Sequence, residues 1–214
     1  MTALWLAAVG GLAGFSAGLF GIGGGAVMVP ALFFAFHALG AEDAVLMHSA
    51  VATSAAVIIV NSWRSVQSHR VRGSVDMALL WPERWWNSYA LWIGIGSFLA
   101  AIALAPRLSS DRLTLIFAIV AIGVSLQFIL GRPDRVLRST VPSGAGPPFI
   151  GGTIGGLSAV MGIGGGSLSV PFLTLCGVPI HRAIGTAAGF GLAIAVPATL
   201  GFIVSGWGLS GRPY

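Results

Sequence analysis

The sequence predicts an all-α membrane protein that crosses the bilayer several times. Hydrophobic residues make up 56% of the 214 residues and charged residues only 8%, against roughly 25% charged residues in soluble domains. The mean hydropathy is +0.91. The apolar residues are concentrated in long runs, and about 20 apolar residues suffice for one transmembrane helix. These observations exclude a soluble globular domain and make the lipid bilayer the main partner of the chain.

Six apolar runs follow one another along the chain, each of helix length and without the alternating pattern of a strand. They cover residues 3–36, 44–61, 86–104, 113–130, 148–176 and 183–205. The first and fifth runs are too long for one simple span, and each contains a cluster of glycines. We expect each of these two runs to form a helix, an unwound turn and a second half-helix. Their length leaves open whether they cross the bilayer once or fold back.

The two glycine clusters have the same sequence, Gly-Ile-Gly-Gly-Gly, at residues 21–25 and 162–166, and each is followed by Val-Pro, at Val29-Pro30 and Val170-Pro171. In a helix, glycine is less favourable than alanine by about 1 kcal/mol, so four glycines in five residues predict a helix break. Inside a bilayer the freed amides must be satisfied by protein or by a water-filled cavity. The repetition favours a paired backbone site over simple close packing of helices, which is the common use of small residues in membranes.

A second similarity supports an internal duplication. Ala50–Ala55 in the second run resembles Ala183–Ala188 in the sixth. We expect residues 1–131 to form a first transmembrane repeat of about four spans, and residues 149–214 to form a second repeat of about two spans that is incomplete. The stretch 132–148 contains four prolines and three arginines, which is the composition of a linker.

The net charge of +5 comes from eleven arginines, no lysine and six acidic residues. The arginines lie in loops between apolar runs, where they orient the chain in the membrane, so nucleic acid is not an expected partner. If every run crosses once, one side of the membrane carries eight arginines and the other carries Arg107, Arg112 and Arg182. The loops 62–85 and 131–147 are therefore expected to be cytoplasmic.

A helix that begins after a break is suited to bind an anion, because its first N–H groups are free and its N-terminus carries a partial positive charge. In transporters built from repeats, such helix ends meet the substrate near the bilayer midplane. Polar side chains within the apolar runs are further candidates, since such groups are uncommon inside a membrane. The candidate substrate-binding residues are Gly21, Gly23, Gly24, Gly25, Gly162, Gly164, Gly165, Gly166, Ser167, Thr53, Ser54, Thr186 and His48.

Three other interpretations fit parts of the sequence. Residues 14–18 match the Gly-x-Ser-x-Gly pattern of serine hydrolases, and Ser16 with His37 or His48 would suggest an intramembrane hydrolase, although Ser16 has no counterpart in the second repeat. Residues 21–26 match a dinucleotide-binding pattern, but the helix-length runs exclude the strands that this fold requires. A membrane scaffold or accessory subunit would have the two glycine clusters packed without a polar cavity between them.

The sequence points to no catalytic residue, metal or cofactor. Cys176 is the single cysteine and lies in an apolar run. It excludes a disulfide framework and a cysteine metal cluster.

Taken together, the paired glycine clusters and the segments at residues 47–54, 68–76 and 181–186 resemble the TauE/SafE family of membrane permeases, also called the sulfite exporter family. The resemblance implies a multi-pass carrier in the bacterial plasma membrane, built from two repeats of about four spans. It further implies transport of small sulfur-containing anions such as sulfite, sulfonates or sulfoacetate, coupled to a proton or ion gradient. Substrate and oligomeric state do not follow from membership. Family members usually continue beyond Trp207 into two further spans, so Tyr214 is expected to mark a truncation.

Overall fold

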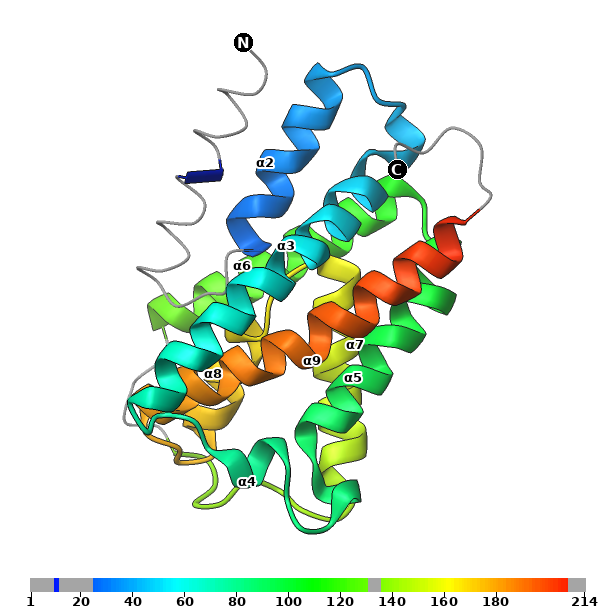
Figure 1. Ribbon diagram of the computed structural model, residues 1–214. Helices are drawn as coiled ribbons and strands as arrows, with labels where there is room; N and C mark the ends of the chain where they lie inside the picture. The colour runs from blue at the N-terminus through cyan, green and yellow to red at the C-terminus, as the bar shows by residue number, and fades with distance from the viewer. Residues whose placement is uncertain (1–9, 12–24, 131–135, 208–214) are drawn as a thin grey trace.

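The computed structural model describes residues 10–11, 25–130 and 136–207, and all of the regular structure in these residues is helical (Figure 1). Four helical segments are long and apolar enough to cross a bilayer. They are α3 (Asp43–Val71), the continuous segment Tyr89–Arg107, α6 (Ser110–Leu130) and α9 (Ile180–Gly206). The predicted all-α membrane architecture is thus confirmed.

The segment Tyr89–Arg107 is not a uniform helix. It begins as α5 (Tyr89–Leu99), continues through a π-helical turn (Ala100–Leu104) and ends in a 3-10 turn (Ala105–Arg107) that contains Pro106. Proline lacks a backbone N–H and cannot continue the helical ladder. The proline therefore explains why the span ends at this point.

Helix α3 is longer than the apolar run 44–61 that predicts it. Residues 62–71, expected to open the loop 62–85, are helical instead. At 1.5 Å per residue, 29 residues give a helix of about 43 Å, which exceeds the roughly 30 Å hydrocarbon core. The polar last turns, with Arg64 and Arg70, therefore extend beyond the hydrocarbon.

Several shorter helices complete the fold. The half-span helices are α2 (Gly25–Ala38), α7 (Gly152–Met161), which follows a π-helical turn (Pro147–Gly151), and α8 (Gly166–Leu175). A single turn, α4 (Met77–Leu80), and a 3-10 turn (Trp85–Asn87) lie between α3 and α5. The half-span helices have 10 to 14 residues, too few to cross a bilayer alone.

Three loops gather at one end of the molecule, which we call the basic end. The loop after α3 contacts α9, because the Asp76 N–H donates to the Thr186 hydroxyl over 2.9 Å. The segment before α7 contacts the start of α5 through a 2.8 Å bond from the Tyr89 hydroxyl to the Pro142 carbonyl. The residues after α6 contact the end of α8, where the Leu137 N–H donates to the Leu175 carbonyl over 2.9 Å.

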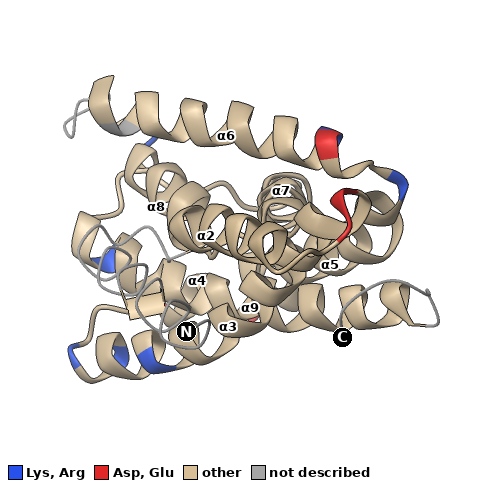
Figure 2. Cartoon of the chain, turned by 90° about the horizontal axis from the view of Figure 1, so that it is seen from above, with Lys and Arg blue, Asp and Glu red and all other residues tan. Residues whose placement is uncertain are grey.

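At the opposite end, the link between α2 and α3 lies near the link between the α5 span and α6. The Met47 N–H donates to the Ser110 hydroxyl over 3.2 Å, and His48 Nε2 lies 3.1 Å from the Ala105 carbonyl oxygen. Charged residues are found near these two ends, and the middle stretches of the helices carry none (Figure 2).

The fifth apolar run folds back on itself, which resolves the alternative that its length left open. Helix α7 starts at the basic end and runs beside α5, with Gly151 next to Trp92 and Gly156 next to Ala100. After the break, α8 returns to the basic end, where Leu175 contacts Leu137. Helices α7 and α8 thus form a re-entrant hairpin.

This fold-back corrects one step of the charge count. Arg182 was placed on the side opposite the main arginine-bearing loops, on the assumption that every run crosses once. The structure places it at the basic end, where its guanidinium lies 3.6 Å from the Asp76 carboxylate.

Small residues bring the helices into close contact. An added Cβ at Gly155 of α7 would lie 2.7 Å from the Ile93 carbonyl carbon of α5, and one at Gly201 of α9 would lie 2.7 Å from the Ala101 Cβ. Such close approach is the usual source of helix association in membranes, where dispersion contacts replace the hydrophobic effect.

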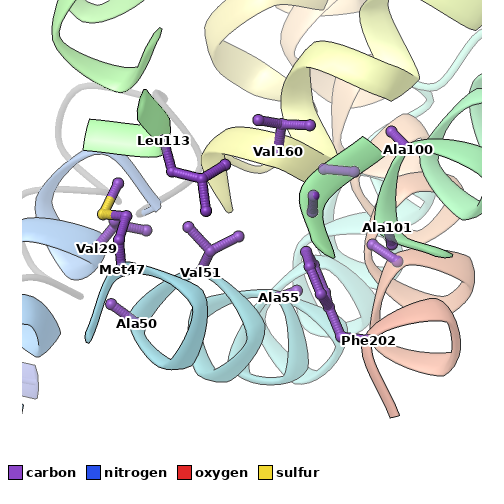
Figure 3. Packing of buried hydrophobic residues seen from close by; sticks show 13 residues of the cluster. Val29, Met47, Ala50, Val51, Ala55, Ala100, Ala101, Leu113, Val160 and Phe202 are labelled. Atoms are coloured by element: carbon purple, nitrogen blue, oxygen red, sulfur yellow. The ribbon is translucent and has the colours of Figure 1, made fainter. Parts of the chain in front are cut away.

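A buried apolar cluster surrounds the end of α7 (Figure 3). Val29 of α2, Val51 of α3 and Val160 of α7 belong to it, together with Leu113 of α6 and Phe202 of α9. The cluster joins the half-span helices α2 and α7 to the long spans and fixes the position of the helix break.

Candidate functional site

The helix break predicted at the second glycine cluster is present. Helix α7 ends at Met161, and Gly162 has a φ of 61°, a conformation that side chains with a Cβ disfavour. The Gly162 N–H donates to the Ala159 carbonyl and the Ile163 N–H to the Ser158 carbonyl, over 3.1 and 3.0 Å. This pair of bonds forms a Schellman motif and satisfies the last carbonyls of α7.

Helix α8 begins at Gly166, and every residue from Gly162 to Ser167 is buried. The first N–H groups of a helix find no partner within that helix. The break therefore presents backbone amides inside the protein rather than to lipid, which is the condition for irregular backbone at membrane depth.

The first glycine cluster is described only from Gly25, the first residue of α2. Gly21, Gly23 and Gly24 lie outside the described residues. Gly25 packs directly on the second cluster: an added Cβ would lie 2.6 Å from the Ile163 Cα and closer still to the Gly162 carbonyl oxygen. The end of the first cluster thus touches the second at a buried point.

Helices α3 and α9 hold the break from two sides. The Ser54 hydroxyl of α3, which is 0% exposed, donates to the Gly162 carbonyl over 2.8 Å. On the other side, an added Cβ at Gly165 would lie 2.5 Å from the Gly191 N of α9. Gly191 in turn contacts the Ser62 side chain of α3. The break is therefore fixed by backbone and hydroxyl contacts to both long helices.

The structure brings some of the predicted site residues together and separates others. Gly25, Ser54 and the segment Gly162–Gly166 meet at the break, and Ser167 follows in the first turn of α8, 1% exposed. Thr53 is next to Ser54 in α3 and is half-buried.

Thr186 and His48 have other partners. The Thr186 hydroxyl accepts the hydrogen bond from Asp76 at the basic end, and the close approach of the Ser74 backbone to Gly185 fixes the same loop on α9. His48 lies one turn beyond Val51, toward the opposite end, with Nε2 near the Ala105 carbonyl oxygen. These hydrogen bonds place the Thr186 and His48 side chains in the surroundings of the break.

Sequence reasoning missed two serines close to the break. Ser158 of α7 and Ser169 of α8 are both 0% exposed. The signal that could have identified them is a hydroxyl in a run of apolar residues and glycines. Such serines usually bond to their own helix backbone, and the sequence does not distinguish those that do not.

The charges around the break are distinctive. Each arginine that the structure describes is exposed, and residues 1–24 contain no ionisable side chain in the sequence. Within the described residues, the groups available at the break to balance an anion are therefore backbone amides, hydroxyls and helix ends rather than arginines.

The groups that the hydrolase interpretation requires are not assembled in the described residues. Ser16 lies outside them, His37 is exposed at the end of α2, and His48 contacts a backbone carbonyl. Burial raises the pKa of the Cys176 thiol, which keeps the sulfur protonated and a poor nucleophile.

Comparison with known proteins agrees with a membrane protein. The chain is 36% identical over 203 residues to a probable membrane transporter protein of Haemophilus influenzae, covering 94% of this chain and 73% of that protein. Proteins of the same description from Xylella fastidiosa and Methanocaldococcus jannaschii are 30% and 29% identical, covering 83% and 85% of this chain. The chain spans 65% of the length of each of these two relatives.

No solved structure matches the chain. The family comparison is specific, because residues 6–211 match the sulfite exporter TauE/SafE family, nearly the whole sequence. These relatives and the family are described as membrane transporters and exporters rather than as enzymes. The chain is therefore a member of the sulfite exporter TauE/SafE family.

Proposed function

We propose that the protein carries small sulfur-containing anions, of the sulfite, sulfonate or sulfoacetate type, across a bacterial plasma membrane. The observation that supports this most directly is the contact of Gly25 with Gly162 and Ile163. From this buried point, the described part of α2 and helix α8 run to opposite ends of the molecule. Their N-termini supply amides and partial positive charge to one place, which suits an anion.

The two hairpins α2–α3 and α8–α9 support an inverted repeat. Pro30 and Pro171 are each the sixth residue of their half-helix, and each half-helix is followed by a glycine with a φ of 78°, Gly40 or Gly177. A long helix follows in both cases, but the two hairpins turn at opposite ends of the molecule. Inverted repeats of this kind allow one half to rock against the other around a central site. The repeat boundaries at 1–131 and 149–214 remain a prediction.

The basic end is proposed to face the cytoplasm. Among the described arginines, six lie at this end and two, Arg107 and Arg112, lie at the opposite end. The six are Arg64, Arg70, Arg72, Arg84, Arg138 and Arg182. An excess of arginine on one side is the main determinant of membrane orientation, and the fold-back of α7 and α8 strengthens this bias by moving Arg182. His48 is the candidate for a coupling proton, since it is the buried histidine among the described residues.

Transport is tested with the purified chain in liposomes. Uptake of labelled sulfite and of a labelled sulfonate is compared with empty liposomes, with and without a pH gradient. Uptake that exceeds the control and is reduced by Gly25→Ala supports the proposal. Uptake equal to that of empty liposomes for every anion would refute it.

A scaffold or accessory subunit is the second candidate function, and one observation favours it. The contacts at Gly25 and Gly165 leave no space for even one added carbon, as expected of glycines that serve close packing. Saturable anion uptake by the chain alone would exclude this alternative. Retention of a partner by the chain without any uptake would support it.

A further inference from the structure

Two serine hydroxyls beside the helix break make no hydrogen bond within the part of the chain that the structure describes. Ser158 lies in α7 and Ser169 in α8, and both are 0% exposed. A buried hydroxyl without a partner is unfavourable by roughly 1–3 kcal/mol. Such groups are uncommon in folded proteins, and each needs an explanation.

The ordinary way to satisfy such a hydroxyl is used elsewhere in the same helices. Thr153 of α7 donates to the Phe149 carbonyl over 2.7 Å, and Thr174 of α8 donates to the Val170 carbonyl over 3.0 Å. In α5, Ser97 donates to the Ile93 carbonyl over 2.8 Å. Ser158 and Ser169 make no such bond to their own helix, so their hydroxyls remain available to another group.

The two serines lie at a similar depth in the re-entrant hairpin. Ser158 is about one turn before the break and Ser169 about one turn after it, and the two helices run in opposite directions. Ile154 lies four residues before Ser158, and Leu173 lies four residues after Ser169. Both apolar residues belong to one buried cluster with α9. Residues four apart share a helix face, so both hydroxyls face the interior enclosed by α5, α7, α8 and α9.

Ser169 has an additional relation to the start of α8. The Cα–Cβ bond of a helical residue tilts toward the N-terminus of its helix, so the Ser169 hydroxyl leans toward the first turn, where the backbone N–H groups have no partner within the helix itself. Two unpartnered hydroxyls and a helix N-terminus thus offer hydrogen-bond donors to the same region. The matching partner is a group of acceptor oxygens.

The charge of that partner follows from the surroundings. The described core contains no arginine, because every described arginine is exposed, and the sequence of residues 1–24 adds no cationic side chain. Helix ends contribute about half a charge each. The desolvation penalty of an ion rises with the square of its charge, so a dianion would pay roughly four times that of a monoanion.

We infer that Ser158 and Ser169 are substrate-binding residues and that, among the anions of the proposed function, the site takes singly charged oxyanions such as simple sulfonates and hydrogen sulfite in preference to dianions such as sulfoacetate and sulfate. The inference rests on the proposed anion transport and specifies the binding residues and the charge of the substrate. It adds to the glycine amides two side chains that flank the second glycine cluster. The positions 141 residues earlier, beside the first cluster, are Ala17 and Met28. The two halves of the site therefore differ chemically.

The test is a binding measurement on the purified full chain by titration calorimetry. The probes are methanesulfonate, a monoanion; sulfate, a dianion; and dimethyl sulfone, a neutral molecule of similar shape. The protein should bind methanesulfonate at least about tenfold more tightly than sulfate and should not bind the sulfone. Ser158→Ala and Ser169→Ala should each weaken methanesulfonate binding by roughly tenfold or more, because each removes a hydrogen bond to a charged group.

Ser97→Ala is the matched control, since its hydroxyl is equally buried but already bonded, and it should bind as the unchanged protein does. The empty Ser158→Ala and Ser169→Ala proteins should melt at or above the temperature of the unchanged protein, because each loses an unsatisfied hydroxyl. Melting below the Ser97→Ala protein would assign the serines a structural role and overturn the inference.

The remaining outcomes separate the inference from the function on which it rests. Unchanged methanesulfonate binding in both serine variants would overturn the role of the serines and leave anion binding intact. Sulfate binding as tight as that of methanesulfonate would overturn the charge preference. Absence of binding of every anion by the unchanged protein would refute the proposed function itself.

Discussion

The contact between the two glycine clusters makes a quantitative prediction for Gly25→Ala. The new Cβ would lie 2.6 Å from the Ile163 Cα, whereas carbon atoms in contact are separated by about 3.5–4.0 Å. Both neighbouring groups belong to the backbone at the break, so no side-chain rotation relieves the overlap. Overpacking of this kind destabilises a folded protein by roughly 1–3 kcal/mol.

A matched control has the opposite expected sign. Gly123 lies in the interior of α6, is exposed, and has no atom within 4 Å of an added Cβ. Gly123→Ala should stabilise the helix by about 1 kcal/mol, because alanine is the better helix former. At Gly25, the first described residue of α2, a gain in helix propensity of at most about 1 kcal/mol does not offset the overlap with the backbone.

The assay is the unfolding midpoint of each purified variant in the same detergent, followed by helical circular dichroism. Gly25→Ala should unfold at a lower temperature than the unchanged protein, and Gly123→Ala at the same or a higher temperature. A Gly25→Ala protein as stable as the unchanged one would show that the two clusters are not in contact, and the paired-site proposal would lose its main support.

Three further predictions concern the surroundings of the break. Ser54→Ala should lower the free energy of unfolding by about 1–3 kcal/mol, because it leaves a buried carbonyl without its donor; an unchanged unfolding midpoint would contradict this. Thr186→Val keeps the shape of the side chain but removes the acceptor for the Asp76 N–H in the loop after α3. This variant should speed protease cleavage of that loop with little change in the unfolding midpoint. Equal cleavage rates would refute the role of this hydrogen bond in holding the loop. Single cysteines are introduced as His181→Cys, Thr140→Cys and Ser109→Cys in a chain that carries Cys176→Ala. An impermeant thiol reagent should label positions 181 and 140 from the same side of the membrane and position 109 from the opposite side. Labelling of positions 181 and 109 from one side would rule out the re-entrant hairpin.

The sequence predicts the helices and the break for physical reasons that are visible in single segments. Long apolar runs without alternation leave only helices as spans, and the glycines at residues 162–166 remove helix propensity where the structure breaks. The predicted start of the loop at residue 62 was wrong, because the arginine-bearing turns after residue 61 are polar but still helical. Hydropathy reports the boundary of the lipid, and the helix continues beyond it.

The direction of α8 and the partner of Thr186 depend on tertiary contacts that no local pattern encodes. The length of the run 148–176 suits one tilted crossing as well as a hairpin, and the assumption of one crossing misplaced Arg182. Thr186 carries the same signal as Thr53, yet its hydroxyl bonds to a loop 110 residues away. Ser158 and Ser169 were missed because a serine that bonds to its own helix and one that does not look the same in a sequence.

The re-entrant hairpin also constrains how the protein enters the membrane. Helices α7 and α8 have 10 residues each, so neither is a stable insertion unit on its own. The bond between Ser54 and Gly162 joins positions 108 residues apart, and the other side of the break is covered by α9, which is synthesised after both. The hairpin therefore reaches its final depth only when α9 has been inserted, and synthesis that stopped before α9 would leave the glycine backbone without its protein cover. Insertion of α9 is thus also the step that assembles the proposed binding site.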